Sequence, residues 1–335
     1  MDLPGFSEVS LAAGRLAGVA VRTPLLRSEA LDTLTGGRVL LKAETLQRTG
    51  SFKIRGAYNR LKQLVEAGLN RRGVVAFSSG NHAQGVAEAA RLLGMHAVIV
   101  MPRDAPALKI DNTRRLGGEI VLYDRWTEDR EAICARIATE RGATVVPSFD
   151  DPGVIAGQGT VGLEMAADAE ALELKLDAVY VPVSGGGLIS GIGIALAHES
   201  PETELYAAEP AGFDDHARSL AARERVANDS TARSICDALL APMPGRLTFA
   251  LNRARLRGGV TATDAEVLGA MAFAVQTLKL VVEPGGAVAL AALLAGRIDA
   301  RGRTIGIVLS GGNVEPAMLA RALDQRVERS FRAEQ

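Results

Sequence analysis

The sequence predicts an α/β protein whose sheets are largely parallel and are covered by helices on both faces. Short runs rich in Val, Ile and Leu alternate with Ala-, Leu-, Arg- and Glu-rich stretches of helical spacing. Near-continuous apolar strands are typical of parallel sheets packed between helices. The expected strands cover 39–41, 74–77, 97–101, 120–122, 178–181, 205–208 and 305–309.

The chain length predicts two lobes. A chain of 335 residues exceeds the usual size of one hydrophobic core. No Gly/Ser-rich linker divides it, so we expect the smaller lobe to be inserted into the larger one. Three strand–helix units lie close together over 65–148, which predicts a small domain there and a large domain built from 1–64 and 149–335.

Composition excludes several classes of protein. The chain has 38 Lys and Arg against 39 Asp and Glu, so no global field favours nucleic acid or a membrane surface. Cys134 and Cys236 are the two cysteines and form no CxxC motif, which indicates neither a disulfide framework nor a zinc knuckle. No secretory leader pattern and no long apolar run is present, so we expect a cytoplasmic protein.

Lys53 is the first candidate catalytic residue. It follows a Gly-Ser turn and precedes a small-residue stretch that is expected to be helical. A lysine amine bonds covalently to an aldehyde cofactor once burial lowers its pKa. An isolated lysine is usually a solvated surface residue, so the polar loops elsewhere in the chain decide between the two interpretations.

Three such loops follow expected strands. The first, 78–85, leads into a helix whose free N–H groups suit a carboxylate, although a simple capped helix is the alternative. The second, 184–188, has three consecutive glycines that let the backbone approach a phosphate. It lacks both the Walker lysine and the G-x-G-x-x-G spacing, which disfavours ATP and nicotinamide. The third begins at Ser310, whose hydroxyl suits a ring nitrogen. The alternative for the second loop is close packing of strand and helix, and the alternative for the third is an ordinary turn.

Together these motifs resemble those of the fold-type II pyridoxal-phosphate enzymes, in particular the serine/threonine dehydratase and serine racemase group. The resemblance covers about residues 22 to 320 and implies a two-lobed fold like the tryptophan synthase β subunit. The matching stretches are Lys42-Ala43-Glu44, Gly50 to Ala57, Ser78-Ser79-Gly80-Asn81-His82, Val154 to Thr160, Pro182 to Leu188 and Ser310-Gly311-Gly312-Asn313.

The resemblance also implies a role for each site residue. Lys53 would hold pyridoxal 5′-phosphate and remove the substrate's α-proton, and Ser79 would lie on the opposite face of the cofactor. The other cofactor-binding residues would be Phe52, Asn81, Ser184, Gly185, Gly186, Gly187, Leu188, Glu283 and Ser310. The substrate carboxylate would be held by Ser78, Ser79, Gly80, Asn81 and His82. For Glu283, capping of the following helix is an equal alternative.

The implied activity is a dehydratase that converts a β-hydroxy amino acid to a 2-oxo acid and ammonia by β-elimination. Serine at the ring nitrogen, rather than aspartate, disfavours transamination. Alternatives are a serine or aspartate racemase, a 3-hydroxyaspartate or hydroxyectoine-pathway dehydratase, and a β-replacement synthase, whose motifs differ at the carboxylate and phosphate loops. The chain has Thr45 and Pro147-Ser148 where the family usually has Asn and His-Pro, so the substrate need not be plain serine or threonine.

Three further expectations follow from the sequence. Glu209, the carbonyl of Phe213 and Asp215 have the spacing with which family members bind Mg²⁺ or Ca²⁺, the alternative being an acidic loop that caps the next helix. Arg125 and Trp126 are candidates to line a substrate pocket, with a surface position the better interpretation. No second regulatory domain follows, so we expect a catabolic enzyme, and a homodimer or homotetramer.

Overall fold

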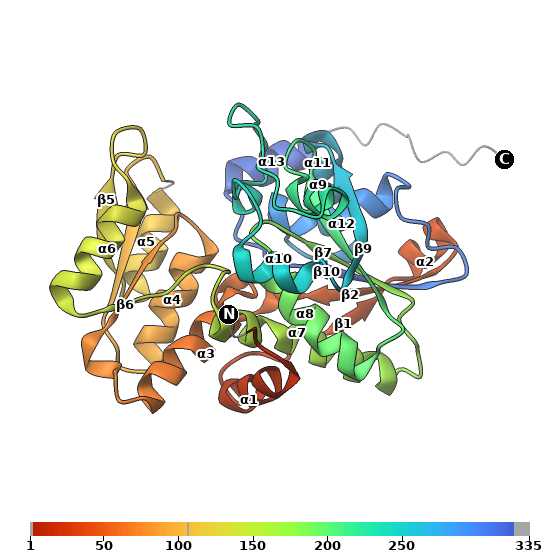
Figure 1. Cartoon of the computed structure of the whole chain (residues 1–335). Coiled ribbons are helices and arrows are strands. Elements are labelled where there is room, and N and C mark those ends of the chain that lie inside the picture. The colour runs from red at the N-terminus through yellow and green to blue at the C-terminus, as the bar shows by residue number, and fades with distance from the viewer. Residues whose placement is uncertain (1–2, 106, 325–335) are drawn as a thin grey trace.

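The computed structural model describes residues 3–105 and 107–324, which form two lobes (Figure 1). The larger lobe contains a six-stranded sheet in the order β1-β2-β10-β7-β8-β9. All neighbouring strands in it are parallel except the pair β1–β2. Its strands are β1 (Leu25–Arg27), β2 (Arg38–Ala43), β7 (Ala178–Pro182), β8 (Glu204–Pro210), β9 (Leu256–Ala262) and β10 (Thr304–Leu309).

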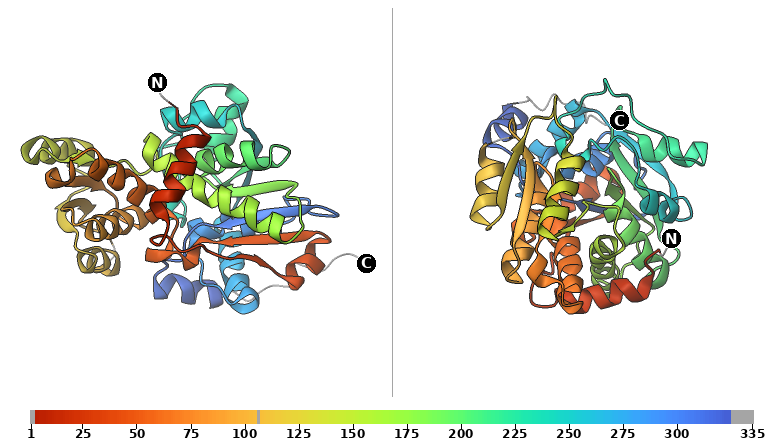
Figure 2. Two further views of the ribbon diagram at one scale, coloured as in Figure 1. Left: turned by 90° about the horizontal axis from the view of Figure 1, so that it is seen from below. Right: turned by 60° about the vertical axis from the view of Figure 1, so that its left-hand side comes forward.

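The smaller lobe contains a four-stranded parallel sheet in the order β5-β4-β3-β6. Figure 2 shows this lobe projecting to one side of the molecule when the structure is seen from below. Its strands are β3 (Val74–Phe77), β4 (Ala97–Pro102), β5 (Glu119–Tyr123) and β6 (Thr144–Val145).

Helices pack around both sheets and connect the lobes. The α-helices are α1 (Phe6–Leu16), α2 (Glu29–Thr35), α3 (Lys53–Glu66), α4 (Asn81–Leu92), α5 (Ala107–Arg115), α6 (Arg130–Arg141), α7 (Pro152–Ala171), α8 (Gly187–Glu199), α9 (Asp215–Ala222), α10 (Arg246–Asn252), α11 (Asp264–Phe273), α12 (Pro284–Leu294) and α13 (Pro316–Asp324). Short helical turns cover Glu44–Leu46, Arg48–Gly50, Asn70–Arg72 and Asp237–Leu239, and a π-helical turn covers Ala274–Leu278.

Strand residues alternate between two cores, as the period of a β-strand requires. In β3, Val74 and Ala76 join the core beneath α3 and α4, whereas Val75 joins the opposite core beneath α6. In β10, Ile307 and Leu309 pack against α11 and α12, and Val308 packs on the side of α7 and α8. Helices therefore cover both faces of each sheet, and the predicted α/β fold is confirmed.

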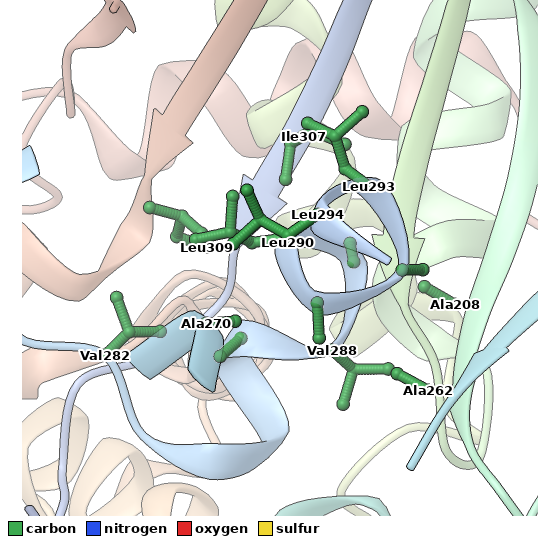
Figure 3. Close-up of a cluster of buried hydrophobic side chains, with 14 of the residues drawn as sticks. Ala208, Ala262, Ala270, Val282, Val288, Leu290, Leu293, Leu294, Ile307 and Leu309 are labelled. Carbon is green, nitrogen blue, oxygen red and sulfur yellow. The ribbon is translucent and has the colours of Figure 1, made fainter. Parts of the chain in front are cut away.

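The largest core lies between α12 and the six-stranded sheet. Figure 3 shows Leu290, Leu293 and Leu294 of α12 against Ile307 and Leu309 of β10. All described residues of α12 are buried, which agrees with a helix that is apolar on every side. This core fixes Glu283, the residue immediately before α12, relative to the end of β10.

All seven strands expected from the sequence are present, and β1, β6 and β9 were not predicted. The sequence of β9 reads Leu-Arg-Gly-Gly-Val-Thr-Ala and lacks the continuous apolar run of the other strands, because two glycines and an arginine interrupt it. It is an edge strand that pairs with β8 among the described strands. The domain limits 65 and 148 stay a prediction. Helix α3 ends near the first of them and packs against α4 of the small lobe and α7 of the large lobe. None of the helices in the described ranges is long and apolar enough to cross a membrane.

Candidate active site

Polar side chains from both lobes meet between the carboxyl ends of β3 and β10. Asn81, the first residue of α4, donates from Nδ2 to Oε1 of Glu283 at 2.5 Å. Its Oδ1 accepts from Nδ2 of Asn313, which also donates to the Thr49 carbonyl at 2.7 Å. Thr49 has a positive φ of 65°, so this contact stabilises a strained turn just before Lys53.

Lys53 is the first residue of α3 and points into this region. Its Nζ donates to the main-chain oxygen of Ser148 at 2.8 Å and lies 5.1 Å from the centroid of the Phe52 ring. Desolvation lowers the pKa of Lys53 to about 8, although the Glu283 carboxylate opposes this shift. The amine is therefore partly unprotonated near neutral pH, as a nucleophile or base requires.

A buried ionic network anchors the helix that carries Lys53. Arg55 is buried and donates to both oxygens of Glu44 at 2.8 Å, and to Oε1 of Glu164 on α7 at 2.6 Å. Helices α3 and α7 also cross closely, because a Cβ on Gly157 would lie 2.5 Å from the carbonyl oxygen of Arg55. The position of Lys53 therefore depends on α7, which contains the Val154 to Thr160 motif.

Glu283 directs its carboxylate into the site rather than to its own helix. It is the N-cap residue of α12 but makes no side-chain capping hydrogen bond, and it accepts instead from Asn81. Burial, and to a lesser degree the Asp237 carboxylate, raises the pKa of Glu283 to about 7. Of the two interpretations that the sequence left open, the geometry favours the site-lining one.

The glycine loop after β7 presents unused N–H groups at the start of α8. Among the described residues, the N–H groups of Gly185, Gly186, Gly187 and Leu188 donate to no protein acceptor. Gly186 adopts a positive φ of 96°, which glycine reaches without strain. A helix N-terminus with several free N–H groups is an anion site.

The loop after β3 forms a second helix N-terminus, at α4. Gly80 donates its N–H to Oγ of Ser78 at 3.1 Å, and Nε2 of His82 contacts the Val146 carbonyl at 2.9 Å. Burial, together with the Lys53 charge, lowers the pKa of His82 to about 3, so its ring is neutral. His82 therefore fixes the loop and contributes no positive charge.

A small cavity of about 50 Å³ adjoins this loop at the carboxyl ends of β3, β4 and β5. Its lining includes Ser78, Ser79, Tyr123, Arg125 and Arg130. Arg125 pairs with Asp104 at 2.8 Å. Arg130 forms no ion pair within the described part of the chain, and its Cζ lies 4.8 Å from the centroid of the Phe77 ring.

Ser310 directly follows β10 and is buried. Its carbonyl accepts the Phe52 N–H at 3.2 Å, which ties the strand end to the turn before Lys53. On that turn, the buried Oγ of Ser51 has no hydrogen-bond partner among the described residues. Buried hydroxyls without partners are uncommon and indicate a position for a bound group or water.

Glu209, near the end of β8, and Asp215, the first residue of α9, lie within electrostatic reach of each other. Both oxygens of Glu209 accept N–H groups of α9, at 2.8 and 3.0 Å, so this carboxylate also caps the helix. Oδ1 of Asp215 accepts from Asn228, while its buried Oδ2 has no partner among the described residues. Burial, with weaker repulsion between the acidic side chains, raises the pKa of Glu209 to about 8 and that of Asp215 to about 6.

Comparison with known proteins agrees with this geometry. Residues 17–311 match the family model described as pyridoxal-phosphate dependent enzyme. The chain belongs to the pyridoxal-phosphate-dependent enzyme family.

It is 46% identical to an L-threo-3-hydroxyaspartate ammonia-lyase of Pseudomonas sp., over 94% of this chain and 97% of that protein. It is 41% identical to an L-threonine ammonia-lyase of Thermotoga maritima, over 97% and 79% of the two chains. The solved structure of maize serine racemase matches with a TM-score of 0.89 and 37% identity, over 96% of this chain and 97% of that one.

The residues present fit pyridoxal phosphate. The glycine loop offers free N–H groups for the phosphate, Lys53 offers an amine of lowered pKa, and Ser51 has an unpartnered buried hydroxyl. The structure brings Lys53, Asn81 and Glu283 into direct or electrostatic contact. The individual roles inferred for the site residues stay predictions.

Glu209 and Asp215 would be the acidic ligands of a divalent cation at this place. Within the described ranges, no three His, Cys, Asp or Glu side chains form a metal-binding group. The unpartnered Oδ2 of Asp215 and the raised pKa values of both carboxyl groups are the features that a cation would relieve.

Several site residues were not identified from the sequence. Arg130 was assigned no role, Ser148 contributes only its carbonyl, and Asn313 was noted only as part of a loop motif. Of the pair considered for a pocket, Arg125 lines the small cavity, whereas Trp126 is 83% exposed and does not. A basic residue at the start of the helix that follows β5 was the available signal for Arg130.

Proposed function

We propose that the protein is an ammonia-lyase that removes water from a β-hydroxy amino acid with a second carboxylate, such as L-threo-3-hydroxyaspartate. The products are a 2-oxo dicarboxylic acid and ammonia, because the enamine left by loss of water takes up water again as it releases its nitrogen. The observation that carries the substrate assignment is the pair Arg125 and Arg130 in the cavity beside Ser78 and Ser79.

The two carboxylates of such a substrate have separate places. The N-terminus of α4, which begins at Asn81, suits the α-carboxylate. Arg130 lines the small cavity together with Ser78 and Ser79 and has no carboxylate partner among the described residues. Serine and threonine carry no group that would neutralise this guanidinium, whereas a distal carboxylate would do so.

The name of the 46% identical relative supports the same substrate, and the matching family model supports the cofactor. The reaction uses the chemistry of that cofactor. Bound pyridoxal phosphate supplies a ring that withdraws electrons from the substrate's α-carbon.

The side chains of this chain supply positioning and proton transfer. Lys53 has a pKa near 8, so its amine can accept the α-proton at neutral to slightly alkaline pH. Asn81 and Glu283 hold the polar edge of the cofactor site through their 2.5 Å hydrogen bond. Ser310, which is buried, would hold the cofactor's ring nitrogen with an uncharged hydroxyl, and such a partner would disfavour transamination relative to loss of the β-hydroxyl.

We further infer that Glu209, Asp215 and the Phe213 carbonyl hold Mg²⁺ or Ca²⁺. The support is the unpartnered Oδ2 of Asp215 and the raised pKa values of both carboxyl groups. Such an ion would order the loop between β8 and α9. A homodimeric or homotetrameric state and a cytoplasmic location stay predictions.

The substrate assignment is tested by substitution of Arg130. Arg130→Ala should lower kcat/KM for L-threo-3-hydroxyaspartate by about 10- to 100-fold, the effect of losing a hydrogen bond to a charged group. The rate with L-serine should remain within about twofold, and Arg130→Lys should recover part of the loss. Arg136→Ala is the matched control, since Arg136 lies on the same helix and pairs with Glu140 in solvent. Equal loss on both substrates would reject a distal-carboxylate site.

A further inference from the structure

Two buried side chains bind the carbonyl groups of the phosphate loop from behind. Nε2 of His216, on α9, lies 2.6 Å from the carbonyl oxygen of Ser184. Oγ1 of Thr248, on α10, donates to the carbonyl oxygen of Gly185 at 2.6 Å. The Gly245 N–H reaches that same carbonyl at 3.2 Å. Thus two successive peptide groups of this loop are held by side chains far away in the sequence.

This arrangement determines where the loop N–H groups point. In a trans peptide group, the carbonyl of one residue and the N–H of the next point in opposite directions. No cis peptide bond occurs in the described chain. When His216 binds the Ser184 carbonyl, the Gly185 N–H is therefore directed away from α9. When Thr248 binds the Gly185 carbonyl, the Gly186 N–H is directed away from α10.

We propose that His216 and Thr248 are positioning residues that aim the Gly185 and Gly186 N–H groups at the cofactor phosphate. These N–H groups have no protein acceptor among the described residues, which is the state of donors reserved for a ligand. Neither side chain was assigned a role from the sequence, and neither is among the residues inferred to touch cofactor or substrate.

The packing around Gly186 supports this inference. A Cβ at Gly186 would lie 2.7 Å from Cε1 of His216 and 2.9 Å from Cβ of Thr248, so both side chains press directly on the loop. Both are buried. The backbone of each residue is also held in place, because the main-chain N–H of His216 donates to Glu209 and the main-chain N–H of Thr248 donates to Asp150. The loop is therefore positioned in advance, which lowers the entropy lost on binding.

The hydrogen bond from His216 to the Ser184 carbonyl leaves the other ring nitrogen of His216 without a partner. A carbonyl can only accept, so Nε2 of His216 must carry the hydrogen and Nδ1 is left with a free lone pair. Nδ1 is buried and has no partner among the described residues. A buried polar atom without a partner is destabilising, so packing alone is a poor explanation for histidine at this position.

The test compares pyridoxal phosphate with pyridoxal, which lacks the phosphate, as ligands of the cofactor-free protein. Thr248→Val keeps the side-chain shape but removes the donor, and His216→Leu removes the other donor. Each should weaken pyridoxal phosphate binding about five- to tenfold and leave pyridoxal binding unchanged. Thr248→Ser and His216→Gln keep a donor and should bind nearly as the wild type does. The ³¹P resonance of the bound cofactor should shift in the first pair only.

Ser219→Ala is the control for general destabilisation. Ser219 is buried on α9, and its hydroxyl accepts from Val226 rather than from the phosphate loop. Equal weakening of both ligands in Thr248→Val, or no weakening of either, would overturn the proposal. Thr248→Val decides alone if His216→Leu does not fold. Cofactor binding is measured without substrate, so a failure here leaves the proposed reaction standing.

Discussion

Asn81 and Glu283 are joined by a hydrogen bond of 2.5 Å, although they are 202 positions apart in the sequence. Asn81 begins α4 after the small-lobe strand β3, and Glu283 precedes α12 of the large lobe. The bond therefore links the two lobes at the site, and it holds the Glu283 carboxylate within electrostatic reach of Lys53. A movement of the small lobe would change the environment of the reactive amine.

Removal of the Lys53 amine should abolish activity while preserving the fold. The Nζ atom makes one hydrogen bond, to the Ser148 carbonyl, so Lys53→Ala costs the structure little. We expect no visible absorption band from lysine-bound cofactor and no turnover, with a melting temperature close to that of the cofactor-free wild type. Absorption spectroscopy and an ammonia assay measure these effects. Near-native turnover in this variant would reject the mechanism.

The lowered pKa of Lys53 predicts a pH-dependent stability of the cofactor-free protein. The native pKa is about 8, and that of an unfolded lysine is about 10.4. Between these values the unfolded chain binds more protons, so the free energy of unfolding should rise with pH from about 8 to about 10. Lys53→Met should remove this rise. Urea unfolding at several pH values measures it, and a stability that is the same function of pH in both proteins contradicts the predicted pKa.

Ser79 should affect racemisation more than elimination. If its hydroxyl returns the proton on the face opposite Lys53, Ser79→Ala removes any inversion of recovered substrate and retains much of the ammonia production. Chiral chromatography of the remaining substrate, in parallel with the ammonia assay, separates the two activities. A proportional loss of both would mean that Ser79 mainly holds the carboxylate.

Chelation should lower stability and activity together. A cation bound only to the folded state stabilises it by about 2.7 kcal/mol at 100 times its dissociation constant. Mg²⁺ or Ca²⁺ should restore both properties, and calorimetry should detect binding. Asp215→Asn is the preferred variant, because Glu209 also caps α9 and its loss would destabilise that helix directly. An unchanged melting temperature in protein shown to be metal-free would reject the cation site.

The sequence was informative where a function depends on a short local motif. Lys53, the Ser78 loop and the glycine loop each follow a strand or turn that the apolar pattern identifies. The Ser78 loop and the glycine loop belong to different sheets, so their proximity depends on how the two lobes pack and is not given by either motif. His216 and Thr248 lie 32 and 63 positions from the carbonyls that they bind, and only the packing of α9 and α10 brings them there. No local pattern encodes such contacts.

Two other features could not be recognised from the sequence, each for a different reason. Arg130 begins an amphipathic helix, where arginine is common on the solvent side, and only the strand ends around it define a cavity. Ser148 acts through its carbonyl, which every residue possesses, so its identity carries no signal. Sequence reasoning therefore identified the residues proposed for the chemistry better than the residues proposed to select the substrate.

The most direct measurement is the activity of the purified holoenzyme on β-hydroxy amino acids. L-threo-3-hydroxyaspartate should yield ammonia and a 2-oxo dicarboxylic acid in equal amounts, with a kcat/KM at least about tenfold above that for L-serine or L-threonine, because Arg130 can pair with the distal carboxylate. Absence of both products from all three substrates, or a clear preference for L-serine or L-threonine, would contradict the proposed function.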